Sequence, residues 1–392
     1  MIGEFDQVIE RCGTNSLKWD ARQARFGRED VIPLWVADMD FRSPQAVIEA
    51  LQRRVEHGIF GYAARLDSYY AAVQGWLAER HGWQVEKEWL VHSPGVVPAL
   101  YGLVRALTEP GDKVMLQSPV YAPFFKAVES SGRTLVNNRL QLSAGRYAMD
   151  LEDLETQIDD RVKMVFLCSP HNPVGRVWTR EELIRLREIC VKYQLILVAD
   201  EIHADLVYPG FKHTCFGTIA GELLSNLVVC TAPSKTFNLA GLQIANVIIP
   251  NPELRRAFER AMEHAGIAEP NVLGLVAAEA AYGHGAGWLD ELIGYLHGNL
   301  NYVKKFVAAQ IPELSIIEPE GTYLVWLDCR KLGLESRALR EFMVTKAKVA
   351  LNDGFAFGPG GEGFMRINIA CPRVTLVEAM ERIAAAISQR SS

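Results

Sequence analysis

The feature that most constrains the fold is a set of short, wholly apolar runs separated by stretches with helical periodicity. Three of these runs are typical of strands buried on both faces of a parallel sheet: Val114 to Leu116, Met164 to Leu167 and Leu195 to Ala199. Between the last two runs, one face of a predicted helix carries Leu183, Leu186, Ile189, Cys190 and Tyr193. This strand–helix–strand unit predicts an α/β fold with a mostly parallel sheet flanked by helices.

The length and the order of the patterns predict two domains. The chain has 392 residues, which exceeds the usual size of a single domain. After about residue 250 the pattern becomes helical, and two further predicted strands and a final helix follow. We expect residues 47–287 to form the large domain, and residues 288–392, joined by the N-terminal segment 1–46, to form a smaller α+β domain.

Charge and cysteine content exclude several classes of function. The net charge of −6 argues against a non-specific nucleic-acid binder, which is normally basic. The seven cysteines form no Cys-x-x-Cys pair and no zinc-like spacing, so we expect reduced, mostly buried thiols and no metal site. No stretch resembles a signal peptide or reaches transmembrane length, so we expect a cytoplasmic protein that binds neither membrane nor nucleic acid.

Lys235 is the lone charged residue of the stretch from Thr231 to Gly241. Apolar, strand-like runs precede and follow this stretch, which places Lys235 on a short loop at a sheet edge. A poorly hydrated lysine has a lowered pKa, so its amine can attack a carbonyl and form a Schiff base. A surface lysine in a turn is the alternative.

Polar residues follow the predicted strands: Gln117 to Tyr121, Cys168 to Gly175, and Asp200 to His203. In open α/β sheets, ligands bind at the carboxyl ends of the strands, so these groups are expected to converge. The turn from Ser93 to Pro98 lies between a strand and an apolar helix, and free N–H groups at such a helix start can hold a phosphate.

These groups suit an aldehyde cofactor with a pyridine ring and a phosphate, attached to Lys235. Asp200 can keep the ring nitrogen protonated, Asn172 can donate to the ring oxygen, and Tyr121 can stack on the ring. Arg366 can pair with a substrate carboxylate. Gly95, Val96 and Val97, together with Ser234, can cradle the phosphate.

Each of these residues has a purely structural alternative. Asp200 and Glu201 can be an acidic pair at a sheet edge, with or without a metal, and Asn172 can belong to a simple turn. Tyr121 can be a core residue, and Arg366 can serve a structural ion pair. The ordered combination favours the cofactor site over these alternatives.

The ordered motifs resemble those of fold type I pyridoxal-phosphate (PLP) enzymes of aminotransferase class I/II. They are Asn172-Pro173-x-Gly175, Asp200-Glu201-Ile202-His203, Ser234-Lys235-Thr236-Phe237-Asn238 and Arg366 in Phe-Met-Arg-Ile-Asn. Four further segments resemble the bacterial carbon–sulfur β-lyases, the cystathionine β-lyase and cystalysin group: 35–41, 58–62, 94–98 and 118–121.

The resemblance implies a homodimer with an amino-acid substrate, in which Tyr62 reaches the cofactor phosphate of the neighbouring subunit. From the residues alone, Tyr62 can equally pack within its own loop. The backbone of Val36 and Ala37 is expected to face the substrate carboxylate. His203 lies where related aminotransferases often have a tyrosine on the ring oxygen, and Gln243 lies where they often have an arginine on the phosphate.

The implied reaction is α,β-elimination of cystathionine or a related thioether or cysteine substrate to pyruvate, ammonia and a thiol. In it, Lys235 acts as nucleophile and base, with Tyr62 and Tyr121 beside it. An aminotransferase is the nearest alternative, and a non-catalytic scaffold is another. The pocket beyond the substrate Cβ is expected to include Phe60, Tyr62, Tyr121 and residues near Ala122 and Asn352.

Two local features complete the sequence predictions. Ser43 is expected to cap a helix that has Pro44 at its first position. The segment Gly358 to Gly363 has the spacing of a dinucleotide fingerprint, but it precedes a strand and opens no helix. We therefore interpret it as a lid or hairpin loop.

Overall fold

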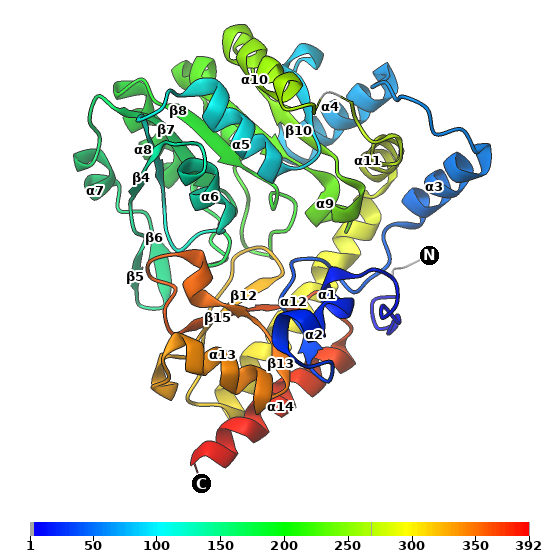
Figure 1. The fold of residues 1–392 in the computed structure, drawn as a ribbon, viewed down its shortest axis with the longest axis vertical. Coiled ribbons are helices and arrows are strands. Elements are labelled where there is room, and N and C mark those ends of the chain that lie inside the picture. The colour runs from blue at the N-terminus through cyan, green and yellow to red at the C-terminus, as the bar shows by residue number, and fades with distance from the viewer. Residues whose placement is uncertain (1–3, 268, 392) are drawn as a thin grey trace.

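The computed structural model describes residues 4–267 and 269–391 and is built on a seven-stranded, mostly parallel sheet (Figure 1). The strand order is β2-β10-β9-β8-β7-β3-β4, and only β10 runs antiparallel to its neighbours. The predicted α/β fold class is thus confirmed. In chain order, these strands are β2 (Leu90–Ser93), β3 (Lys113–Leu116), β4 (Thr134–Asn137), β7 (Val162–Cys168), β8 (Ile196–Asp200), β9 (Leu227–Thr231) and β10 (Ala245–Ile248).

Alternate residues of these strands enter two separate cores, one on each face of the sheet. Val114 and Leu116 belong to the core that includes residues of α5, α6 and α10, whereas Met115 belongs to the core that includes residues of α4, α8 and α11. Burial on both faces explains why these strands read as continuous apolar runs. The helices are α4 (Asp67–His81), α5 (Val96–Leu107), α6 (Pro123–Glu129), α8 (Arg180–Lys192), α10 (Pro252–His264) and α11 (Val272–His284).

A second, antiparallel sheet lies in the lower half of Figure 1, in the order β11-β12-β15-β14. Its strands are β11 (Ser315–Ile317), β12 (Leu324–Asp328), β14 (Asn352–Asp353) and β15 (Phe364–Asn368). The long helix α12 (Ala286–Gln310) extends from the large sheet towards this region, where α13 (Ser336–Thr345) and α14 (Arg373–Ser391) also lie.

The N-terminal segment joins the C-terminal part of the chain through a two-stranded parallel pair. In this pair, β1 (Ile32–Pro33) lies beside β13 (Val349–Ala350). The remaining elements are α1 (Leu17–Asp20), α2 (Arg22–Phe26), α3 (Gln45–His57), α7 (Leu151–Thr156), α9 (Pro233–Thr236) and the hairpin of β5 (Gln141–Ser143) and β6 (Arg146–Ala148). The exact domain boundaries stay a prediction.

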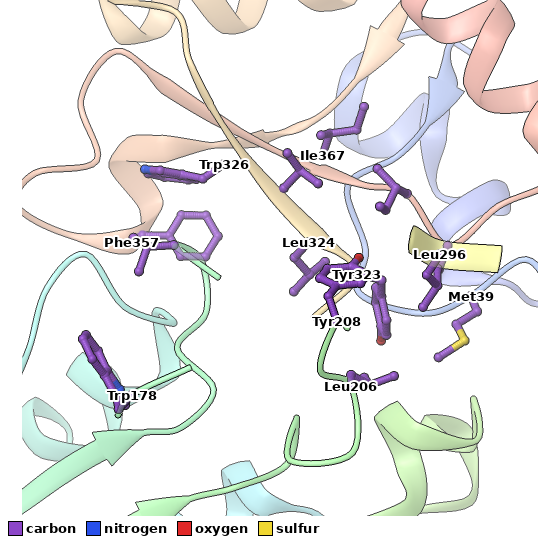
Figure 2. Close-up of a cluster of buried hydrophobic side chains, with 14 of the residues drawn as sticks. Met39, Trp178, Leu206, Tyr208, Leu296, Tyr323, Leu324, Trp326, Phe357 and Ile367 are labelled. Atoms are coloured by element: carbon purple, nitrogen blue, oxygen red, sulfur yellow. The ribbon is translucent and has the colours of Figure 1, made fainter. Parts of the chain in front are cut away.

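Buried side chains from distant parts of the sequence meet between the two sheets, as Figure 2 shows. Trp326 and Phe357 have ring centroids 5.4 Å apart with an interplanar angle of 80°. Tyr208 and Leu206, from the segment after β8, lie near Tyr323 and Leu324 at the start of β12. This apolar contact fixes the position of β15, and with it Arg366, relative to the large sheet.

The structure corrects one predicted helix start and agrees with two other predictions. The helix α3 begins at Gln45 with Pro44 before it, and Ser43 does not cap it. Instead, Ser43 Oγ donates to the Asn238 carbonyl, so tertiary contact outweighs the local capping preference. The glycine-rich segment 358–363 leads into β15 and opens no helix, as expected. All seven cysteines are free, and all except Cys12 are buried.

Among the described residues, no helix is both long and apolar enough to cross a membrane.

Candidate active site

A cavity of about 170 Å³ lies at the carboxyl ends of the parallel strands. It receives residues that follow β2, β3, β7, β8 and β9, which converge because parallel strands end at the same edge of a sheet. The lining residues are Ala37, Pro94, Gly95, Val96, Val97, Pro98, Tyr121, Cys168, Asn172, Asp200, Ile202, His203, Ser234, Lys235, Ala240 and Ile244.

Lys235 lies on α9, a single helical turn after β9, and not on a loop at a sheet edge as the sequence suggested. β9 is an interior strand with β10 and β8 on either side, so the lysine enters the middle of the strand ends. Its Nζ donates to the Ala37 carbonyl at 2.7 Å. Burial, followed by the nearby Arg366 cation, lowers the pKa of the amine to about 8. Part of the population is therefore a neutral amine near neutral pH.

Asp200 and His203 line the cavity from the end of β8 and the turn after it. One Asp200 oxygen accepts from the Ile202 N–H at 3.1 Å, and burial raises the pKa of the carboxyl to about 7. Burial also lowers the pKa of the His203 imidazole to about 3, so the ring is neutral. His203 Nδ1 is buried without a hydrogen-bond partner among the described residues. This part of the lining therefore presents to a ligand a carboxyl group and a ring nitrogen that has no hydrogen-bond partner among the described residues.

The amino end of α5 forms another part of the cavity lining. Gly95 precedes the first turn in extended backbone, and Val96 and Val97 begin the helix. No side chain caps this end, so its backbone N–H groups and the positive end of the helix dipole are available to an anion. Ser234, which precedes the lysine, lines the same cavity. Groups of this kind can hold a phosphate.

Arg366 lies in β15 and is 2% exposed. Its Nη1 donates to Asn172 Oδ1 at 2.9 Å, and its Nη2 donates to the Trp35 carbonyl at 3.0 Å. Its Nε has no partner, and no carboxylate of the described residues forms an ion pair with it. Burial lowers the pKa of the guanidinium to about 10, so it remains charged at neutral pH. A buried cation without an anion is costly, and a bound carboxylate would remove that cost.

The remaining predicted residues differ in their placement. Tyr121 lines the cavity, and burial raises the pKa of its hydroxyl. Val36 is beside the cavity rather than in its lining, and its carbonyl accepts from Asn368 Nδ2. Gln243 is also outside the lining, at the end of a 3-10 turn with left-handed backbone. Tyr62 is 98% exposed in the segment 58–66, outside the cavity of its own chain.

Three polar residues to which the sequence analysis assigned no role hold the strap of residues 36–41. Tyr323 donates its hydroxyl to the Ala37 carbonyl at 2.9 Å, so this carbonyl accepts from two side chains. Asn368 Nδ2 donates to the carbonyls of Val36 and Asp38 at 2.6 Å each. Asn238 contacts the backbone of Met39 and Phe41. The sequence carried a signal for two of these residues. Asn368 is a polar residue within an apolar strand, and Asn238 lies only three residues after Lys235.

The described residues include no group of three or more His, Cys, Asp or Glu side chains that could hold a metal. The groups brought together here are a buried amine, a buried carboxyl, an uncapped helix start and an arginine without an ion-pair partner among the described residues.

Comparison with known proteins relates this site to a family. Residues 29–383 match the family model of Aminotransferase class I and II. The chain is 46% identical over 385 residues to cystathionine beta-lyase PatB of Bacillus subtilis, covering 98% of this chain and 100% of that protein. It is 36% identical over 387 residues to Protein MalY of Escherichia coli, covering 98% of each.

A solved structure shows the same fold. Cystalysin from Treponema denticola, whose structure contains a pyridoxal 5'-phosphate cofactor, matches with a TM-score of 0.97 and 39% identity over 100% of both chains. The resemblance predicted from the sequence motifs is thereby confirmed. This chain is a member of the aminotransferase class I and II family.

Proposed function

We propose that this protein is a pyridoxal-phosphate-dependent carbon–sulfur β-lyase. It cleaves cystathionine or a related thioether or cysteine substrate, with water, into a thiol, pyruvate and ammonia. The observation that carries the proposal is the meeting of the buried Lys235 amine and the buried Asp200 carboxyl in one cavity. The similarity to cystathionine beta-lyase PatB and to cystalysin supports the lyase reaction in particular.

The residues of the cavity fit pyridoxal phosphate. Asp200 is a carboxyl whose pKa is raised by burial, and a pyridinium N–H would stabilise its charged form. His203 Nδ1 is a buried nitrogen without a partner, and Asn172 lies in the same lining, so both can contact the ring oxygen. The amino end of α5 and Ser234 suit the phosphate, and Tyr121 suits the ring face.

When bound, pyridoxal phosphate supplies an aldehyde that bonds to amines and a protonated ring that accepts electrons from the substrate Cα. Asp200 holds the proton on the ring nitrogen. Arg366 binds the substrate carboxylate beside the Ala37 backbone. Lys235, once its amine is free, removes the Cα proton as a general base, and the thiol leaves from Cβ. The lowered pKa of Lys235 suits this role because a neutral amine has a lone pair available.

Incubation of the holoenzyme with cystathionine and no keto acid tests the reaction type. A lyase forms pyruvate and thiol continuously, whereas an aminotransferase stops after one turnover until a keto acid is added. The variant Lys235→Ala is the matched control and should lose both pyruvate formation and the visible absorbance of lysine-bound cofactor. A Lys235→Ala variant that kept both pyruvate formation and this absorbance would contradict the proposal.

An aminotransferase is the second candidate, because the family model includes that reaction and the same base can return the proton to a different carbon. A non-catalytic scaffold is a further alternative. Lys235, Asp200 and Asn172 line one cavity, and Arg366 donates to Asn172 beside it. This arrangement argues against a scaffold, because a buried cation without an anion is costly to keep in a site that binds nothing.

The active unit that we propose is a homodimer. The segment from Val55 to Leu66 exposes Val55, Ile59, Phe60, Tyr62 and Leu66. Apolar side chains gathered on one exposed segment favour contact with another protein surface. A second copy would cover them and bring Tyr62 to the neighbouring cavity.

A further inference from the structure

A carboxylate whose side chain is only 9% exposed contacts the turn that carries Lys235. Asp205 Oδ2 accepts from Thr236 Oγ1 at 2.7 Å, and Thr236 is the residue after Lys235. Asp205 Oδ1 accepts from Trp76 Nε1 at 3.1 Å and lies 2.8 Å from His81 Nε2. Asp205 is thus held by α4 and in turn holds α9. None of these four side chains belongs to the lining of the cavity described above.

The lysine turn needs such an anchor. The helix α9 has four residues, and a single helical turn has too few internal hydrogen bonds to fix its own orientation. Packing supplies a second contact with the same helix: the rings of Trp76 and Phe237 lie 5.3 Å apart in an edge-to-face arrangement. Both contacts connect α4 to residues immediately after Lys235.

The anchor carries charge. Burial opposes a proton on His81, but the hydrogen bond to Asp205 and the negative charges of Asp205 and Glu201 together outweigh burial and raise the pKa of the His81 imidazole. Burial likewise disfavours the Asp205 anion, yet His81 and Thr236 lower the pKa of its carboxyl. A charged acceptor forms a stronger hydrogen bond to the Thr236 hydroxyl than a neutral one does. Glu201 and His213, 3.2 Å apart, form a second buried pair next to His81.

Asp205 also connects the segment after β8 to the turn that carries Lys235. It lies two residues after His203 in the turn that begins with Asp200, and it reaches across to the turn that carries Lys235. We propose that Asp205 is a positioning residue: anchored by His81 and Trp76, it holds Thr236 and so sets the direction from which the Lys235 amine enters the cavity. This inference rests on the proposed function for its kinetic consequence.

The variant Thr236→Val tests it, because valine keeps the shape and removes only the hydroxyl. For the holoenzyme with cystathionine, we expect kcat to fall about tenfold, the effect of one lost hydrogen bond to a charged group, while KM stays unchanged. Thr236→Ser, which keeps the hydroxyl, should restore kcat. Glu79→Gln is the control on the same helix and should leave kcat unchanged, since Glu79 is exposed and forms no hydrogen bond or ion pair among the described residues.

A second readout does not depend on lyase activity. In the cofactor-free protein, brief acetylation with acetic anhydride followed by mass spectrometry reports the reactivity of Lys235. We expect Thr236→Val to change the acetylation rate of Lys235 several-fold and leave that of an exposed lysine, Lys87, unchanged. If Thr236→Val does not fold, Asp205→Asn, which has the same shape without the charge, replaces it with the same expected outcomes.

Parent values of kcat and Lys235 acetylation in Thr236→Val or Asp205→Asn would overturn the inference. Equal losses in Thr236→Val and Thr236→Ser would also overturn it, because they would show a purely structural role. If the parent enzyme forms no pyruvate from cystathionine but Lys235 acetylation still responds to Thr236→Val, the proposed reaction fails and the positioning role stands.

Discussion

Arg366 and Asn172 are 194 positions apart in the sequence, and a hydrogen bond of 2.9 Å joins Arg366 Nη1 to Asn172 Oδ1. This bond connects β15 of the small sheet to the segment after β7 of the large sheet. It orients a buried guanidinium that has no carboxylate partner of its own among the described residues. The relationship suggests a binding point for a substrate carboxylate beside the cofactor cavity.

Replacement of Arg366 should therefore weaken substrate binding more than cofactor binding. For Arg366→Lys, which keeps a charge but loses the planar fork, we expect KM for cystathionine to rise about thirtyfold, from a loss of about 2 kcal/mol. Cofactor affinity, measured by fluorescence titration with pyridoxal phosphate, should change little because Arg366 is outside the cavity lining. An unchanged KM would refute the assigned role.

Asp200 should make the cofactor-free protein less stable as pH rises. Its pKa is about 7 in the folded protein and 3.8 ordinarily, so between these values the folded state binds more protons than the unfolded state. Its contribution is full below the ordinary value and is lost as the pH rises towards 7. From pH 5 to pH 7 the parent should lose about 2 kcal/mol more unfolding free energy than Asp200→Asn. Urea unfolding of both proteins at each pH measures this difference, and parallel curves would contradict it.

Tyr62 should act on the neighbouring subunit. Tyr62→Ala and Lys235→Ala are each expected to be nearly inactive alone. After unfolding and refolding together, hybrid dimers contain one site with both residues intact, so activity should return to about a quarter of the parent value. Light scattering checks the dimer. If Tyr62 served its own chain, the mixture would stay inactive.

The strap of residues 36–41 should depend on a buried ion cluster. Lys18 is 0% exposed, and its Nζ lies 2.6 Å from Asp40 Oδ2; Arg11 contacts both Asp38 and Asp40. Lys18→Met leaves buried carboxylates short of one cation, so we expect a loss of about 3 kcal/mol in unfolding free energy. Arg28→Gln, which breaks the exposed pair with Asp30, is the control and should show no measurable loss. Equal stability of the two variants would contradict the prediction.

Much of the fold could be predicted because it depends on local patterns. The apolar runs of β3, β7 and β8 and the periodicity of α8 are properties of neighbouring residues, and the structure confirms them. The predicted start of α3 was wrong because Ser43 donates to the carbonyl of Asn238, a residue far along the chain, instead of capping the helix. The predicted position of Lys235 at a sheet edge was also wrong. Whether a strand lies at the edge or in the interior of a sheet depends on the strand order, which a local sequence pattern does not specify.

The sequence by itself determined the α/β class, the family, and the set of residues expected around Lys235: Asp200, Asn172 and Arg366. Only the tertiary structure decided that the lysine amine contacts the Ala37 carbonyl, that Tyr323 shares this acceptor, and that Asp205 holds the next residue through Thr236. The physical reason is that a sequence motif shows which chemical groups are present but not which distant groups they contact. Packing of the two sheets and of α4 decides which of those groups, often some 200 positions apart, come within hydrogen-bonding distance.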